Sequence, residues 1–475
     1  MASVSETRVP RRTAFGAKSP IVPKAVTGPV RRAKWIVLIV LLGIYWIAPW
    51  IRWDRGAHAP DQAFLIDLAH GKAYFLFFEI WPQEVYVVTG ILIMMAVGLF
   101  LLTALFGRVW CGFACPQTVW TDLYMLVERW IEGDRARRLR LDAAPWTASK
   151  IAKRVAKHAA WIVIAVLTGG AWVLYFNDAP TVMGEILTGT AGVGVYATIA
   201  LLTGTTYVLA GWARETVCTF MCPYARFQGA MMDPDTVSVS YRAWRGEPRG
   251  KRKPGESRPG QGDCIDCRQC VEVCPTGIDI RNGLQVSCIN CGLCIDACNA
   301  IMDRMGSPAG LIAFDTERNL AASAEGGHAP RRYIRVRTML YATVYALVGL
   351  AILYALLTRT PLEASALPDR NPLFVTLSDG SIRNGYTLKL LNRTQKPQTV
   401  VIGHHGLPGA EIAFVGTDDR GGRAVTVAPD SVASLRAYVT VPQSAWTGGP
   451  VDFEFELESA GGDYRATAPA RFEGP

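Results

Sequence analysis

The chain has 475 residues, of which 50% are hydrophobic and 19% are charged, and its net charge is +9. This composition excludes a disordered chain, and the mean hydropathy of +0.18 is too high for an ordinary soluble enzyme, so we expect a membrane protein of several structural units. The chain is also too long for a secreted disulfide scaffold, and its twelve cysteines therefore favour metal chemistry.

Five stretches contain no Asp, Glu, Lys or Arg, and each approaches the length of about 17 to 25 residues that crosses a bilayer as a helix. These stretches are residues 35–51, 85–107, 159–177, 186–213 and 338–358. They predict five transmembrane helices, of which the fourth is longer than a bilayer requires. No apolar segment precedes residue 34, so the first helix is expected to act as an uncleaved signal anchor.

Residues 63–81, between the first two predicted spans, are apolar but are interrupted by Asp67, His70, Lys72 and Glu79. This mixture predicts an interfacial helix outside the membrane. An ordinary loop is the alternative.

Four cysteines form two C-x3-C-P motifs, Cys111 to Pro116 and Cys218 to Pro223, each just past the end of a predicted span. The repetition predicts a duplicated two-span hairpin. On one face of a helix, cysteines four residues apart stand about 5 to 6 Å from each other, wider than the about 3.8 Å of a disulfide. The pairs therefore favour a shared soft metal such as Cu(I), and a structural role is the alternative. Each proline would end its helix or fix the angle at which the chain leaves it.

The other eight cysteines form two quartets with the spacing C-x2-C-x2-C-x3-C. In two-cluster ferredoxins, three cysteines of such a quartet bind one cubane and the fourth binds the other. Structural zinc sites, the alternative, use ligand pairs separated by longer intervals. We predict one [4Fe-4S] cluster on Cys264, Cys267, Cys270 and Cys298, and a second on Cys288, Cys291, Cys294 and Cys274.

Residues 366–473 alternate apolar and polar side chains in short runs that are separated by Gly, Pro, Asn and Asp. This pattern predicts an all-β immunoglobulin-like sandwich, for which a binding or scaffolding role is more natural than catalysis.

The segments that connect the predicted spans fall into two groups with net charges of +15 and −6. The basic group is residues 1–34, 108–158 and 214–337, and the other is residues 52–84, 178–185 and 359–475. Cytoplasmic segments near spans retain Lys and Arg, so the basic group is predicted to be cytoplasmic and the other to lie across the membrane. The overall basicity thus reflects topology and gives no indication of nucleic-acid binding.

The sequence predicts five parts, which follow one another along the chain. It comprises a basic cytoplasmic tail (1–33), a four-span α-helical membrane core with both C-x3-C-P motifs (34–230), a cytoplasmic dicluster ferredoxin-like α+β domain (231–336), a fifth transmembrane helix (337–358) and the immunoglobulin-like sandwich (366–473).

This arrangement resembles the cytochrome c oxidase accessory protein family called CcoG, FixG or RdxA. The likeness rests on the two C-x3-C-P motifs, on the dicluster segment 264–298, on Cys222-Pro-Tyr-Ala-Arg-Phe-Gln228 and on Leu377-Ser-Asp-Gly-Ser-Ile-Arg-Asn-Gly-Tyr386. The resemblance implies a bacterial inner-membrane protein with a periplasmic C-terminal domain. It also implies support for assembly of a cbb3-type oxidase by reduction of Cu(II) to Cu(I) before copper delivery.

The resulting hypothesis is a cupric reductase in which cytoplasmic electrons enter the two clusters and reach copper at Cys111, Cys115, Cys218 and Cys222. Its partners would be a cytoplasmic electron donor and either oxidase subunits or copper-delivery proteins. Two alternatives stay open: a quinol-linked electron-transfer subunit, as in periplasmic nitrate and nitrous oxide respiration, and a non-catalytic assembly scaffold. Small residues along 190–194 and 204–211 would allow close helix packing but do not fix an oligomeric state, and a homodimer stays open.

Overall fold

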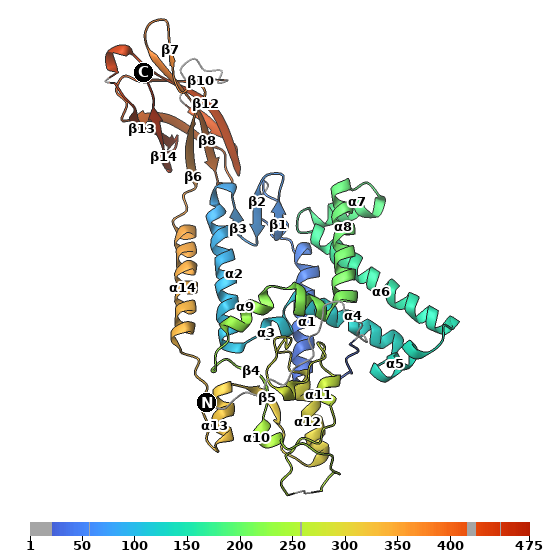
Figure 1. Ribbon diagram of the computed structural model, residues 1–475. Coiled ribbons are helices and arrows are strands. Elements are labelled where there is room, and N and C mark those ends of the chain that lie inside the picture. The colour runs from blue at the N-terminus through green and yellow to red at the C-terminus, as the bar shows by residue number, and fades with distance from the viewer. Residues whose placement is uncertain (1–20, 57, 257–258, 416–423, 447) are drawn as a thin grey trace. The chain divides into compact units, whose positions relative to one another are not determined.

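The structure is a computed structural model that describes residues 21–56, 58–256, 259–415, 424–446 and 448–475. The chain divides into two compact units. The first comprises the residues up to Ile51 and Gln62–Ile352, and the second comprises Arg52–Asp61 and Leu353–Pro475. The first unit holds all twelve cysteines, and the second is rich in strands (Figure 1).

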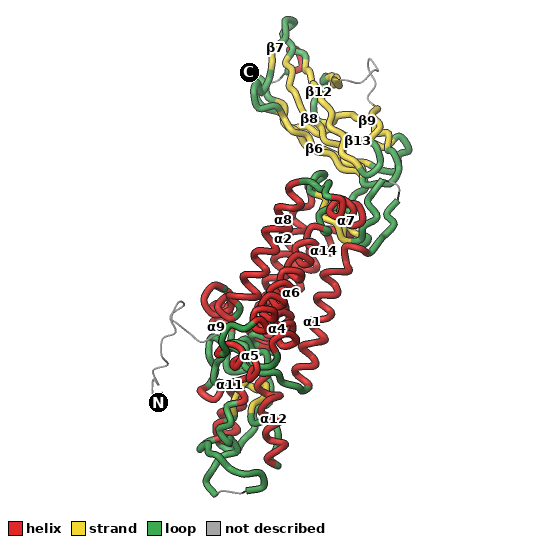
Figure 2. Tube along the Cα trace, turned by 90° about the vertical axis from the view of Figure 1, so that its right-hand side faces the viewer, coloured by secondary structure: helices red, strands yellow, loops and turns green. Residues whose placement is uncertain are grey.

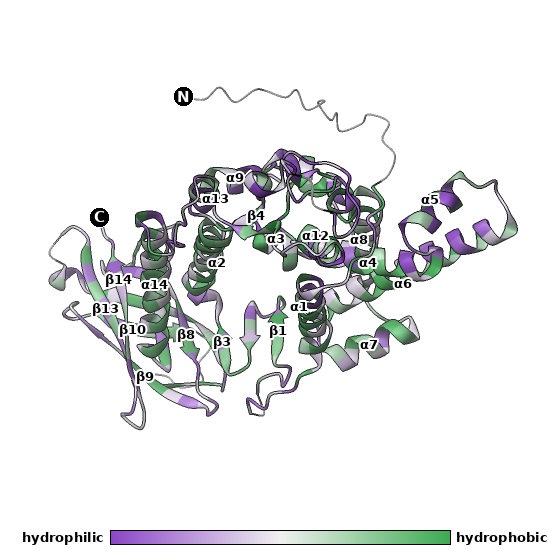
Figure 3. Cartoon of the chain, turned by 90° about the horizontal axis from the view of Figure 1, so that it is seen from below, coloured by the Kyte–Doolittle hydropathy of each residue, from purple (hydrophilic) through white to green (hydrophobic). Residues whose placement is uncertain are grey.

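Five helices in the described part of the chain are long and apolar enough to cross a membrane, as predicted. No more than 33% of each apolar window is buried within the chain, so most of the apolar surface faces outward, as lipid-exposed helices require. The colouring of Figure 3 contrasts the hydrophobic α2 and α14 with the hydrophilic α5 (Arg135–Ala143). The spans are α1 (Pro29–Ile47, continued by a 3-10 turn to Trp50), α2 (Val85–Phe106), α6 (Ala148–Val173), α8 (Val193–Thr206, continued by the π-helical η3, Tyr207–Ala213) and α14 (Val336–Leu357).

Two boundaries differ from the prediction. The stretch 186–213 begins inside a separate helix, α7 (Ala179–Thr188), which Gly189 ends in a left-handed conformation at φ +77°. The span therefore starts only at Val193. Helix α6 begins eleven residues before the predicted stretch, at Ala148, because Arg154 and Lys157 form ion pairs with Glu132 at 2.8 and 3.0 Å and so extend the helix beyond its apolar part.

Residues 63–81 form a small antiparallel sheet, and the interfacial helix that we predicted there is wrong. The sheet has the order β1 (Phe64–Asp67), β2 (Lys72–Phe75), β3 (Phe78–Ile80). Gly71 at φ +70° and Leu76 at φ +53° reverse the chain between these strands, and such backbone conformations interrupt a helix. The Ile66 N–H donates to the Tyr175 carbonyl at 2.8 Å, so the sheet lies at the end of α6.

At the other end of the spans, short helices surround the C-x3-C-P motifs. The first motif begins within α3 (Val109–Phe113) and ends at the first residue of α4 (Pro116–Glu132). The second begins within the π-helical η4 (Val217–Met221) and ends just before α9 (Tyr224–Met231).

The two cysteine quartets occupy an α+β segment in which loops predominate (Figure 2). Strand β4 (Ser238–Tyr241) pairs antiparallel with β5 (Ile312–Asp315). A buried core that includes Val239, Met302 and Leu311 joins the strands to the cysteine loops. The helices of the segment are α10 (Ala243–Gly246), α11 (Gln269–Glu272), α12 (Leu293–Met305) and α13 (Glu317–Ala324).

The second unit is a two-sheet sandwich, as predicted, and its first strand starts at Leu362, slightly before the predicted residue 366. The strands of the five-stranded sheet are β10 (Glu411–Val415), β12 (Ser431–Val441), β8 (Ile382–Asn392) and β6 (Leu362–Pro368), with β7 (Val375–Thr376) also on β8. The four-stranded sheet is β11 (Ala424–Val427), β9 (Gln398–His405), β13 (Val451–Ser459) and β14 (Arg465–Phe472).

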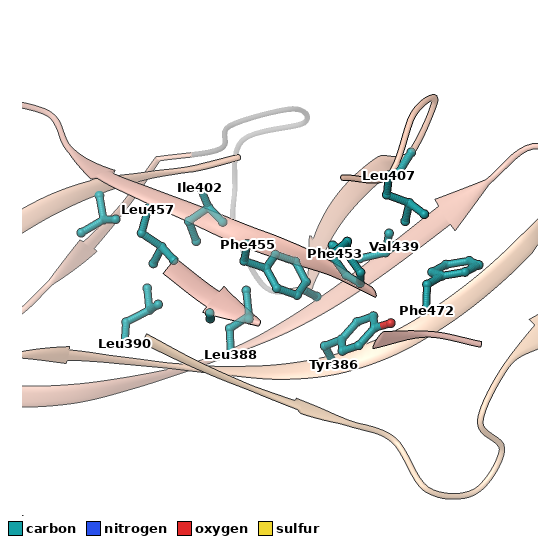
Figure 4. Packing of buried hydrophobic residues seen from close by; sticks show 14 of the residues in the cluster. Tyr386, Leu388, Leu390, Ile402, Leu407, Val439, Phe453, Phe455, Leu457 and Phe472 are labelled. Atoms are coloured by element: carbon teal, nitrogen blue, oxygen red, sulfur yellow. The ribbon is translucent and has the colours of Figure 1, made fainter. Parts of the chain in front are cut away.

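Side chains from both sheets meet in the core of the sandwich (Figure 4). Tyr386 and Phe455 are fully buried, and their rings lie edge to face with centroids 5.5 Å apart. The Tyr386 hydroxyl donates to the Arg471 carbonyl at 2.8 Å, so the one polar atom of this ring is satisfied. All twelve cysteines lie in the first unit, so no disulfide crosslinks the sandwich.

Candidate electron-transfer site

The four cysteines predicted to bind the first cluster line one pocket, although Cys298 comes from α12 and the other three come from the preceding loop and α11. Cys264 and Cys270 are buried, and Cys267 is exposed at the mouth. The full set is Cys264, Cys267, Cys270 and Cys298.

A second pocket is lined by the four cysteines predicted for the second cluster. Cys270 contacts this pocket too, so the two pockets are neighbours. The set is Cys274, Cys288, Cys291 and Cys294.

The backbone turns in the same way around both pockets. Asp266 and Arg268 flank the second cysteine of the first quartet with φ of +53° and +55°, and Asn290 and Gly292 flank the second cysteine of the other quartet with φ of +59° and +69°. Left-handed residues on either side of a cysteine reverse the chain direction twice, which lets a short loop wrap around a compact group.

The donor set of each pocket fits a [4Fe-4S] cluster. Burial raises the pKa of Cys270, Cys288 and Cys298 to about 12, so four thiolates in such a pocket need a compensating positive charge. Iron provides that charge, and thiolates are the ligands of [4Fe-4S] clusters.

Neither C-x3-C-P pair lies on one continuous helix, so our prediction of a single helical face is wrong. Cys115 follows the end of α3 and has an extended ψ of 130°, and Cys222 follows η4 with ψ of 113°. The prolines do not end helices, which was one of the two roles expected for them. Pro116 is the first residue of α4 and Pro223 directly precedes α9, positions where the fixed φ of proline favours helix initiation.

The two motifs nevertheless share a local design, as a duplication predicts. Gly107 and Arg214 each end a span with positive φ, +58° and +41°, and each stands four residues before the first cysteine of its motif.

The regions around the two C-x3-C-P motifs are also hydrogen-bonded to each other. Gln117, after the first motif, donates to the Leu209 carbonyl at 2.8 Å. Gln228, after the second motif, accepts from Arg108 Nε at 2.7 Å and from the Cys111 thiol at 3.4 Å. A glutamine that follows each motif therefore forms hydrogen bonds with residues near the other motif.

The four thiols of these motifs are close enough to influence one another. Burial and, to a smaller extent, the nearby Cys115, Cys111 and Cys222 together raise the pKa of Cys218 to about 12. Burial likewise raises the pKa of Cys111 to about 11, against the opposing charge of Arg108. Among the described residues, no three His, Cys, Asp or Glu side chains are gathered as the ligands of one metal ion would be.

The thiol motifs pack directly on the loop that carries the second quartet. Cys111 and Cys218 lie against a buried cluster that contains Ile289 and Cys291. A Cβ atom at Gly112 would lie 2.7 Å from the Ile289 carbonyl oxygen and 2.9 Å from Cys291 Cα, so only glycine permits this approach.

Two polar residues fix this contact. Arg108 donates through Nη1 to the carbonyls of Val286 and Cys288, the latter at 3.0 Å. Asn290 donates through Nδ2 to the Phe106 carbonyl at 3.0 Å and accepts from the Val239 N–H at 2.6 Å. The loop of the second quartet is thereby bound to the end of α2.

Buried charges of α1 and α4 lie beside the same loop. Asp122 accepts from Lys34 at 2.9 Å and from Arg31 at 3.0 Å, and burial of Asp122, which raises its pKa, is outweighed by these two cations. Burial raises the pKa of the Cys291 thiol, and the positive charge of Lys34 opposes that change. Asp296, between Cys294 and Cys298, accepts from the Arg31 N–H at 2.7 Å.

A third pocket reaches Cys218 from the side of α4. Its wall combines charged residues with Met125, Pro275 and Ile289, and Pro275 directly follows Cys274, the last cysteine of the first quartet and a predicted ligand of the second cluster. The charged lining residues are Lys34, Asp122, Arg214 and Glu215. Cys218 therefore lines a small pocket whose wall carries charges of both signs.

Sequence reasoning did not identify Arg108, Asn290, Lys34 and Asp122 as parts of the site. A weak signal was present, because Arg108 and Asp122 flank the first C-x3-C-P motif and Asn290 precedes a cysteine of the second quartet.

The helices and pockets define a multi-pass membrane protein of the iron–sulfur class. Three family descriptions agree with this class. Residues 88–133, which include the first C-x3-C-P motif, match a 4Fe-4S binding domain. Residues 213–317, which include the second motif and both quartets, match a 4Fe-4S dicluster domain. Residues 352–475 match the IG-like fold at the C-terminus of FixG.

Curated relatives cover most of the chain. It is 46% identical to the nitrogen fixation protein FixG of Rhizobium meliloti, over 100% of this chain and 96% of FixG. It is 50% identical to protein RdxA of Cereibacter sphaeroides, over 94% of this chain and 95% of RdxA. It is 53% identical to protein RdxB of the same organism, over 80% of each chain. The chain belongs to the FixG/RdxA/RdxB family, which confirms the resemblance drawn from its motifs.

Proposed function

We propose that this protein carries cytoplasmic electrons through two [4Fe-4S] clusters to copper and reduces Cu(II) to Cu(I) for assembly of a cbb3-type oxidase. The observation that carries the proposal is the packing of Cys111 and Cys218 against the loop of the second quartet. A redox group held by that loop would lie beside four thiols, and thiolates favour Cu(I) over harder metals. The oxidase and the copper substrate come from the family resemblance.

Contacts between loops support the proposed topology. The three basic segments meet at one end of the spans, where the Lys24 N–H donates to the Glu272 carbonyl at 2.8 Å and the Ala25 N–H donates to Asp134 at 2.9 Å. Two of the acidic segments meet at the other end, where Gln62 accepts from the Ala179 N–H at 2.9 Å. Segments of like predicted location therefore contact each other. We assign the basic end to the cytoplasm and the other to the periplasm, with the sandwich assigned by charge alone.

The proposed cluster ligands are Cys264, Cys267, Cys270 and Cys298 for the first cluster, and Cys274, Cys288, Cys291 and Cys294 for the second. Each cluster, when bound, supplies one-electron storage. Gly112 allows the thiol motif to approach the second quartet, and Arg108 holds the two together.

At the thiols, each Cu(II) ion gains one electron and becomes Cu(I). Cys111, Cys115, Cys218 and Cys222 lose protons when they bind copper, and their side chains draw together around the ion. The pocket beside Cys218 gives the ion a way in.

The test uses the full-length protein purified without oxygen. Its clusters are reduced, Cu(II) is added, and cluster reoxidation is followed together with Cu(I) captured by a Cu(I)-specific chelator. We expect one Cu(I) for each electron lost in the wild type, and little of either in a variant with serine at Cys111, Cys115, Cys218 and Cys222.

Iron content separates this loss from loss of the clusters, since both proteins should hold about eight iron atoms per chain. Clusters that are reoxidised by a quinone and not by Cu(II) would contradict the proposal and favour the quinol-linked alternative. Normal oxidase assembly by a redox-inert variant would favour the scaffold.

A further inference from the structure

A strongly basic loop joins α10 to α11 next to the pocket of the first quartet. Residues 242–253 contain six Lys or Arg residues and a single acidic residue, Glu247. In Figures 1 and 2 this loop lies at the end of the first unit that is away from α8. It is therefore not part of the contact between the ferredoxin-like segment and the spans.

Arg245 of α10 and Arg252 of the loop anchor this segment, and Arg242 pairs with Asp315 at 2.9 Å. Of the other cations, Arg249 also pairs with Glu247 at 3.2 Å. Arg245 pairs with Asp263, and Arg252 donates to the Ser307 hydroxyl at 2.7 Å. The Gly250 N–H donates to the Cys264 carbonyl at 3.0 Å, which fixes the loop to the first cysteine of the quartet. Arg249, Lys251 and Lys253 are exposed.

The first pocket opens on this same surface. Cys267 is the one exposed cysteine of the twelve, and the neighbouring Arg268 is exposed as well. The nearby carboxylate of Asp266 pairs with Arg281, so the surface around Cys267 keeps its positive charge. The second quartet faces the C-x3-C-P thiols instead, and an electron that enters from solvent must therefore enter at the first quartet.

We propose that the surface formed by Arg249, Lys251, Lys253, Arg268 and Cys267, here called the basic entry surface, docks an acidic one-electron carrier protein that reduces the first cluster. This inference rests on the electron-transfer function proposed above. One electron leaves the reduced cofactor of the carrier and enters the oxidised cluster, and no bond or proton is exchanged. Complementary charge steers such encounters and raises the association rate by about 10- to 1,000-fold.

The test compares two variants of the full-length protein that change net charge equally. In the entry variant, Arg249, Lys251 and Lys253 are replaced by Glu. In the control variant, three other exposed cations, Arg137 and Arg140 of α5 and Lys153 of α6, are replaced by Glu. Stopped-flow absorbance follows cluster reduction by a purified acidic ferredoxin and, separately, by reduced methyl viologen, a small cation.

We expect the entry variant to lower the second-order rate constant with ferredoxin by about 10- to 100-fold at low ionic strength, and the control variant to change it by less than about threefold. The difference should shrink in about 0.5 M salt, where charges are screened. Reduction by methyl viologen should not slow in either variant. A milder variant, Lys251→Gln with Lys253→Gln, should lower the rate constant with ferredoxin by a smaller factor. This variant tests the proposal if the triple charge reversal causes loss of iron.

Equal rates in the entry variant and the wild type, or an equal fall in the control variant, would overturn the docking proposal. So would a wild type that methyl viologen reduces and the ferredoxin does not. Reoxidation by Cu(II) in the same samples separates the two proposals. If Cu(II) reoxidises the clusters but charge reversal has no effect, only the docking proposal fails. If charge reversal slows reduction but Cu(II) is not reduced, the copper function fails and the docking surface stands.

Discussion

Replacement of Gly112 by alanine tests the contact between the first thiol motif and the second quartet. The added Cβ would lie 2.7 Å from the Ile289 oxygen, 2.9 Å from Cys291 Cα and 3.0 Å from the Asn290 carbonyl carbon. All three are backbone atoms, so no side-chain rotation relieves the overlap. To reach an ordinary contact of 3.4 Å, the two segments must separate by about 0.7 Å.

Overpacking of this kind costs about 1 to 3 kcal/mol, which corresponds to a shift of about 5- to 150-fold in the equilibrium between docked and separated segments. Because alanine is more stable than glycine within a helix, the substitution itself offsets up to about 1 kcal/mol of that cost. We expect reoxidation of the clusters by Cu(II) to slow in Gly112→Ala, while their reduction by a small-molecule donor keeps its rate. Stopped-flow absorbance of the anaerobic protein measures both steps.

The matched control is Gly229→Ala in α9, one residue after Gln228, where an added Cβ would meet no atom within 4 Å. This variant should react with Cu(II) at the wild-type rate. If Gly112→Ala retained the wild-type rate and iron content, close backbone packing would not be needed for electron transfer to copper, and the reasoning would be refuted.

Two further predictions concern other parts of the chain. Lys34→Met removes a buried positive charge near Cys291, so the reduction potential of the second cluster should fall by on the order of 30 mV. The potential of the first cluster should not change. A redox titration followed by electron paramagnetic resonance measures both potentials. An equal shift of both clusters would show that the effect is not local. Phe455→Ala empties a fully buried position of the sandwich and should destabilise the second unit by about 3 to 5 kcal/mol, seen as faster hydrogen exchange in β8 and β13. Iron content should stay constant, and a loss of iron would mean that the two units fold together.

The features that depend on short-range spacing could be predicted from the sequence. Cysteines three or four residues apart must share a short segment, so the two quartets followed from spacing. The exchange of Cys274 and Cys298 followed from the pattern of two-cluster ferredoxins, and the two pockets are lined by the predicted sets. The spans followed from composition, since apolar length limits what can cross a bilayer.

Features that depend on distant partners could not be predicted in the same way. Arg108 and Gln228 lie 120 residues apart in the chain, and neither motif indicates that they are hydrogen-bonded. Residues 63–81 have a composition that suits either a helix or a sheet, and left-handed turns at Gly71 and Leu76 decide for the sheet. The helical face considered for the thiol pairs fails for a local reason: a residue directly before proline favours extended backbone, which Cys115 and Cys222 adopt, so this signal was present in the sequence.

The hydrogen bonds of Asp296 have a consequence for biosynthesis. This carboxylate caps the start of α1 through the N–H groups of Val30 and Arg31, yet it lies 265 residues after Arg31 in the chain. The ribosome therefore delivers the first membrane helix long before its cap exists. The cap lies near the start of α12, between Cys294 and Cys298, so the beginning of α1 is completed only when that helix has formed and docked. Completion of the first membrane helix is thus coupled to the folding of the iron–sulfur segment.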